Sequence, residues 1–131
     1  MELLNNELLD ALEKQASESG RLRAAHDLRT SGNDGSQRML NALLPGTQVP
    51  VHRHPASAET VMMVRGSVTE IFYDENGKET NRFTLDAASG LYGLQVPVGQ
   101  WHTVAVTEPC VILEIKDGKY APAAPEDIMN I

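Results

Sequence analysis

The sequence has little of several features that define whole classes of proteins. Its 131 residues include one cysteine, Cys110, so no internal disulfide can form and a reducing compartment is expected. No apolar run is long enough to cross a bilayer. The first residues lack the cationic and apolar regions of a signal peptide. These absences predict a cytoplasmic protein with no membrane partner.

Basic residues are also few. The chain has 11 lysines and arginines against 18 aspartates and glutamates, which gives a formal net charge of −7. The basic residues are scattered, and no cluster could pair with a phosphate backbone, so we expect no nucleic-acid partner. With 41% hydrophobic residues, the chain can bury one core without help from a second domain.

One segment near the N-terminus has the pattern of a substantial helix. From about Asn6 to Gly20, leucine and alanine recur at helical spacing and charged residues occupy the other face. A polar, glycine-containing loop follows at 30–36. The remaining pattern is short apolar runs separated by turn residues, which predicts eight strands: 38–44, 49–54, 59–64, 68–73, 79–85, 91–96, 102–107 and 110–116.

This pattern predicts an all-β, single-domain sandwich or barrel with an N-terminal α-helix. We divide the chain into a helix and loop that pack on the barrel (1–35), the barrel itself (36–117) and a C-terminal segment (118–131). Because that last segment contains Pro122 and Pro125, it is expected to be a surface segment and not a strand.

The strongest chemical signal is His52-Arg53-His54, followed by Glu59 and, much later, by His102. Two histidines one residue apart in a strand point to the same face. Neutral imidazoles with one carboxylate suit a divalent transition metal such as Zn, Fe, Ni, Mn or Co. The alternatives are a hydrogen-bonded polar cluster without metal, or the His-x-His of amidohydrolases and metallo-β-lactamases, which need longer chains and further ligands that are missing here.

The spacing resembles the cupin superfamily. Gly46, five residues, His52-x-His54, four residues, Glu59, six residues and Gly66 match its complete first motif, and Pro97-x-Gly99-x-x-His102 is similar to its second motif. The second match is partial, because Val106 stands where an asparagine is typical. The resemblance implies a cupin β-barrel (a double-stranded β-helix or jelly roll). It also implies one divalent metal per chain, bound by His52, His54, Glu59 and His102.

Further segments resemble the WbuC group of cupin-fold metalloproteins, namely residues 21–26, 37–43 and 118–120. That group is associated with bacterial surface-polysaccharide (O-antigen) gene clusters. The resemblance implies a fold, a metal site and a setting in polysaccharide metabolism, and it leaves the reaction open.

Four other residues are candidates for substrate binding: Arg38, Asn41, Tyr92 and Gln95. Arg38 is a cation within an apolar strand. Pointing inward, it would bind a carboxylate or phosphate, and pointing outward, it would be a solvated charge. Both orientations remain open. His26 is interpreted as a surface or capping histidine, and Cys110 as a small hydrophobe.

The leading hypothesis is a metal-binding cupin that handles a small polar metabolite, a sugar or sugar nucleotide, through an open metal coordination position. An isomerase or epimerase activity would fit this hypothesis. The alternatives are a non-catalytic module that senses a metabolite or metal, and an O₂-dependent metal dioxygenase. Because small cupins must pair or cover their sheet edges, a homodimer is also expected.

Overall fold

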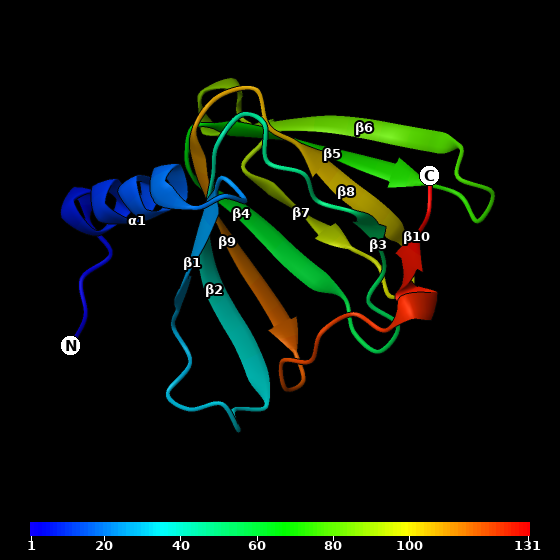
Figure 1. Ribbon diagram of the computed structural model, residues 1–131, viewed down its shortest axis with the longest axis horizontal. Helices are drawn as coiled ribbons and strands as arrows, with labels where there is room; N and C mark the ends of the chain where they lie inside the picture. The colour runs from blue at the N-terminus through cyan, green and yellow to red at the C-terminus, as the bar shows by residue number, and fades with distance from the viewer.

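The computed structural model describes residues 1–131, and two five-stranded antiparallel sheets make up most of it (Figure 1). The elements are α1 (Asn6–Glu18), β1 (Arg23–Asp27), β2 (Ser36–Leu43), β3 (Val51–His52), β4 (Glu59–Arg65), β5 (Ser67–Tyr73), β6 (Glu79–Asp86), β7 (Gly93–Val96), β8 (Trp101–Ala105), β9 (Cys110–Asp117) and β10 (Ile128–Met129), with short 3₁₀ turns at Ala87–Ser89 and Pro125–Asp127.

The first sheet has the strand order β1-β2-β9-β4-β7, and the second has the order β10-β3-β8-β5-β6. Strands distant in sequence are therefore neighbours in both sheets, as in a jelly roll. Each of the eight strands expected from the sequence is present, and the predicted all-β fold with an N-terminal helix is confirmed.

The helix α1 lies on the outer face of the first sheet (Figure 1). The side chain of Asn5 caps it by accepting a hydrogen bond from the backbone N–H of Leu8. Its buried face, Leu9, Leu12 and Ala16, packs against Leu40, Ala42 and Val111 of β2 and β9. The strand β2 is consequently covered on one face by the helix and faces the space between the sheets with the other.

The main core fills part of the space between the two sheets. Its buried members are Leu43, Val61, Val68, Phe72, Leu85, Val96, Cys110 and Ile112. Val61 follows Glu59 with period two on β4, and Phe72 is paired with His102 across β5 and β8. The apolar packing thus continues directly into the polar region that holds the histidines.

Three expectations about the elements were wrong in detail. The N-terminal region contains the strand β1, which pairs with β2 over its whole length. The C-terminal segment is not only surface, because β10 pairs with β3. The strand expected at 49–54 is a strand only over Val51–His52, so His54 lies beyond its end.

No helix is long and apolar enough to cross a membrane.

Candidate metal centre

Three histidines from two neighbouring segments converge between the sheets. His52 ends β3 and is paired with His102 of β8. His54 follows two residues later, and its backbone carbonyl accepts a hydrogen bond of 2.9 Å from the N–H of Gly99. One nitrogen from each of the three rings lies within 4.8 Å of the others. This is the spacing expected of ligands that share one ion.

Two of these rings are oriented by backbone carbonyls. His52 Nδ1 lies 2.8 Å from the carbonyl oxygen of Pro50, and His102 Nδ1 lies 3.0 Å from that of Gln100. A carbonyl oxygen only accepts, so each Nδ1 carries the proton and each Nε2 keeps its lone pair. Burial, reinforced by His102, lowers the pKa of His52 to about 4, so this ring is neutral at pH 7. Both features suit a metal ligand.

Glu59 approaches the histidines from β4 of the opposite sheet. Its Oε2 lies 3.4 Å from His54 Nε2, and its Oε1 lies 3.6 Å from His102 Nε2. Burial opposes ionisation of this carboxyl, but the neighbouring imidazoles of His102 and His54 hold its pKa below the ordinary value. Glu59 is therefore a carboxylate at neutral pH, and it adds a negative oxygen donor beside three nitrogen donors.

The third ring has a different partner. His54 Nδ1 lies 3.0 Å from the amine of Lys116 on β9. The Nε2 atom is buried and makes no hydrogen bond. A buried polar nitrogen without a partner is costly, and coordination would give it one. The donor set of three imidazoles and one carboxylate thus fits a divalent transition metal.

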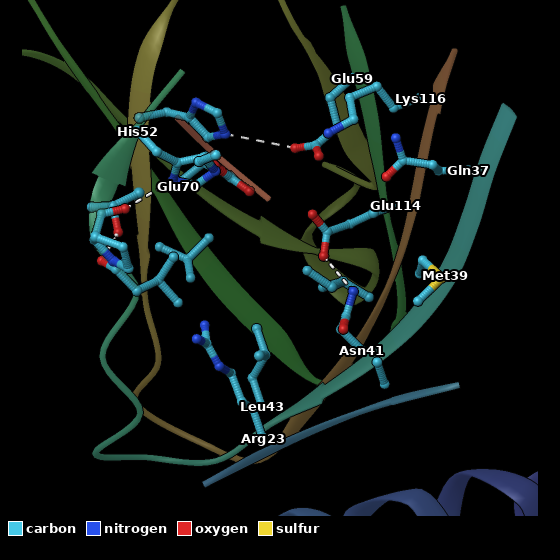
Figure 2. Close-up of a pocket in the computed structure, with 18 of the residues that line it drawn as sticks. Arg23, Gln37, Met39, Asn41, Leu43, His52, Glu59, Glu70, Glu114 and Lys116 are labelled. Carbon is cyan, nitrogen blue, oxygen red and sulfur yellow. Dashed lines mark hydrogen bonds and ion pairs between the residues drawn. The ribbon is translucent and has the colours of Figure 1, made fainter. Parts of the chain in front are cut away.

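A pocket of about 510 Å³ opens beside the histidines, within the usual range for small-molecule sites. In Figure 2, His52 and Glu70 lie on one side, and Glu59, Lys116 and Glu114 lie on the other. The remaining polar or charged lining residues are Arg21, Arg23, Gln37, Asn41, His102, Thr103 and Tyr120.

Two further carboxyl groups are buried in this pocket. Glu70 on β5 is 2% exposed, and its Oε2 has no hydrogen-bond partner. Burial, with a contribution from the charge of Glu59, raises the pKa of Glu70 to about 8. Glu114 on β9 accepts a hydrogen bond from the side-chain amide of Asn41, and burial together with Glu59 raises its pKa well above the ordinary value. Glu70 is therefore mainly protonated at pH 7 and can donate a hydrogen bond, and burial favours the same neutral form of Glu114.

The four candidate substrate residues are found in different places. Asn41 lines the pocket. Arg38 is outside the pocket lining, and its guanidinium bonds to Ser36, Asp34 and the carbonyl of Leu28, so the outward alternative describes it. Gln95 donates to the hydroxyl of Thr60 and lines a separate, smaller pocket. Tyr92 is 58% exposed and lines neither pocket.

Sequence reasoning did not select Glu70, Glu114, Lys116 or Arg23. A usable signal existed for Glu70, because it alternates with Val68 and Phe72, whose period-two pattern marks the buried face of β5. Glu114 and Lys116 likewise alternate with Ile112 on β9, but both neighbours of Glu114 are also apolar, so the pattern there was ambiguous.

His26 and Cys110 are outside the histidine site. His26 Nε2 lies 3.0 Å from Glu2 Oε2 near the surface. Cys110 is fully buried in the core, and burial raises the pKa of its thiol to about 12, so it stays protonated.

Known structures resemble this fold over most of the chain. CapF of Staphylococcus aureus, a capsular polysaccharide assembling protein, matches with a TM-score of 0.64 at 20% identity, over 79% of this chain and 30% of that one. Oxalate oxidase in complex with glycolate matches with a TM-score of 0.62 at 16% identity, over 79% of this chain and 55% of that one. A conserved protein of unknown function from Streptococcus pyogenes gives 0.59 at 14% identity, over 79% and 80% of the two chains.

CapF and oxalate oxidase are cupin proteins, and at such identities all three neighbours show the fold alone. The chain spans less than a third of the length of CapF. No curated protein matches the sequence. One family model, described as "Domain of unknown function (DUF6016)", matches residues 4–85, which is more than half of the chain. The protein is therefore a member of the DUF6016 family, with a cupin fold and a three-histidine site that fits a divalent metal.

Proposed function

We propose that the protein is a metal-dependent cupin that binds a small polar metabolite, a sugar or sugar nucleotide, at an open coordination position of its metal. The ligands in this proposal are His52, His54, Glu59 and His102. The observation that carries it is the convergence of the three ring nitrogens within 4.8 Å, with His52 and His102 in the lining of a 510 Å³ pocket. Four protein ligands leave room for substrate or water on an ion that accepts five or six.

A bound divalent metal would polarise a carbonyl or hydroxyl oxygen of the ligand, or lower the pKa of a bound water. The chain's own residues supply the rest. Pro50 and Gln100 hold two imidazoles in orientation through their carbonyls. Burial favours the protonated form of Glu70 and of Glu114 in the same pocket, and a protonated carboxyl there can donate a hydrogen bond or a proton to a ligand oxygen. This combination supports an isomerase- or epimerase-type reaction more than simple storage of a metal.

Surface-polysaccharide metabolism is the proposed setting. It is supported by the resemblance to the WbuC group and by a fold neighbour described as a capsular polysaccharide assembling protein. We also propose a cytoplasmic homodimer, since the edge strands β1, β6, β7 and β10 leave backbone groups that a second copy could pair or cover.

The metal assignment is tested by removing two ligands together. The double variant His52→Ala/His54→Ala should lose metal in elemental analysis of the purified protein, while wild type carries close to one ion per chain. His26→Ala is the matched control, because this fourth histidine lies outside the site. Full metal content in a folded double variant would contradict the proposal.

The same purified protein separates the two alternative functions. A dioxygenase should contain iron after anaerobic purification and should consume O₂ with an organic substrate, whereas zinc or nickel without O₂ uptake argues against it. A sensing module should bind its metabolite without converting it, which mass spectrometry of the recovered ligand would show.

A further inference from the structure

Most arginines of this chain form an ion pair with a carboxylate, but two do not. Of its seven arginines, five form ion pairs with a carboxylate: Arg29, Arg38, Arg53, Arg65 and Arg82. The other two, Arg21 and Arg23, form none, and both line the pocket that His52 and His102 also line. In a chain with a net charge of −7, carboxylates are in excess. Two arginines without partners at one place are therefore a specific feature of the pocket.

The register of the first sheet explains why Arg23 faces the pocket. Arg23 on β1 is paired with Leu43 on β2, and paired residues of an antiparallel ladder point to the same face. Leu43 and Asn41, two residues earlier, both line the pocket. Figure 2 shows the Arg23 side chain directed from the β1 side into the space below His52, Glu70 and Glu114.

A second observation also indicates a ligand. Glu70 is a buried carboxyl in the wall of the same pocket, and its Oε2 has no partner within the protein. Arg23 does not act as its counter-ion, since no ion pair joins them. The pocket thus presents an unpaired guanidinium and an unpaired carboxyl separately. A guanidinium matches an oxyanion with its fork of donors, and a carboxyl matches a hydroxyl group.

We propose that Arg23, assisted by Arg21, forms an oxyanion subsite, and that the pocket takes a polyol bearing a phosphate or carboxylate group. In this arrangement the anionic group pairs with Arg23, a hydroxyl group bonds to Glu70, and another oxygen faces the histidine site. The proposal rests on the proposed function for the sugar part of the ligand only, because the anion contact itself needs no metal.

The test is calorimetric titration of the zinc-loaded protein with three probes: glucose, glucose 1-phosphate and glucuronate. One or both anionic probes should bind at least tenfold more tightly than glucose, and the stronger one identifies phosphate or carboxylate as the source of the charge. Arg23→Gln should remove this advantage, and Arg23→Lys should keep part of it. Arg82→Gln, which alters an exposed ion pair on β6 outside the pocket, should change nothing.

Glu70→Leu should remove the contact to the hydroxyl group of the ligand and weaken the binding of glucose 1-phosphate. In the double variant Glu70→Leu/Arg23→Gln, the second substitution should weaken this binding further, because the two residues contact different parts of the ligand. Equal binding of glucose and both anions, no binding of any probe, or an unaltered Arg23→Gln variant would overturn the proposal. Repeating the titration after removal of zinc by a chelator distinguishes the two proposals. The Arg23 effect should persist there even if the metal assignment fails.

Discussion

The substitution Glu70→Gln is expected to change how the stability of the metal-free protein depends on pH. The pKa of Glu70 rises in the folded state from 4.5 to about 8, because the carboxyl is buried and lies near the charge of Glu59. Between these two values the folded protein holds a proton that the unfolded chain releases. Stability from this group is therefore complete below about pH 4.5 and is lost as the pH rises toward 8.

The size of the effect follows from the shift. One pKa unit corresponds to about 1.4 kcal/mol, so the full shift amounts to about 5 kcal/mol above pH 8. Between pH 5 and pH 7 the wild type should lose about 2–3 kcal/mol relative to the glutamine variant, which has no proton to release. Any constant difference between the two side chains cancels, because only the change with pH is compared.

The assay is chemical denaturation at several pH values in the presence of a chelator, for the wild type and for Glu70→Gln. Glu75→Gln is the control, because that carboxyl is exposed in the turn between β5 and β6. Adding zinc should reduce the difference, since a nearby cation favours the ionised form of Glu70. Parallel curves for the wild type and Glu70→Gln from pH 5 to pH 8 would refute the reasoning about this buried carboxyl.

Two further substitutions test contacts around the site. Arg53→Ala should destabilise the protein by about 1–3 kcal/mol in thermal unfolding and expose residues 118–131 to proteases. It removes a 2.8 Å bond to the buried Asp127 and stacking on the Trp101 ring at 4.6 Å, and unchanged proteolysis would contradict this role. Lys116→Met should tighten zinc binding about tenfold, because the cation that it removes lies 3.0 Å from His54 Nδ1 and disfavours a second cation nearby. Lys119→Met is the control, because Lys119 lies outside the pocket lining. Weaker zinc binding by Lys116→Met would refute this effect.

The three-histidine cluster could be predicted from the sequence because its information is local. His52 and His54 are one residue apart, and the distances to Glu59 and Gly66 in the chain form a recognisable pattern. His102 was found because its own short motif places it after a turn. The structure adds that His54 lies beyond the end of β3, where the hydrogen bond from Gly99 and not a strand ladder fixes the backbone.

The orientation of Arg38 could not be predicted because β2 is buried on both faces. Leu40 and Ala42 pack under the helix, while Leu43 faces the space between the sheets. Apolar side chains therefore lie on both faces of β2, and the sequence shows no alternation of apolar and polar residues there. Gln95 is the opposite case. It lies between Leu94 and Val96, which pack inward, and that alternation already indicated an outward side chain.

The two short strands at the chain's ends were missed for a different reason. β1 has no run of β-branched residues, and it is held by its full-length pairing with β2. β10 has only two residues, and the contact of Arg53 with Asp127 next to it contributes to its position. Both depend on contacts between residues far apart in the chain, which local patterns do not contain. Because Arg23 belongs to β1, its place in the pocket lining was missed with that strand.

The charge of the pocket is opposite to that of the whole chain, and burial is the cause. Burial raises the pKa of Glu70 to about 8 and the pKa of Glu114 well above its ordinary value, which favours the neutral form of both carboxyls, whereas the pKa of Glu59 is held below its ordinary value. Arg21, Arg23 and Lys116 contribute three positive charges to the same lining. A divalent ion at the histidines would add two more. An acidic protein therefore has a cationic pocket, and anionic ligands should be attracted to this part of its surface and repelled by the rest.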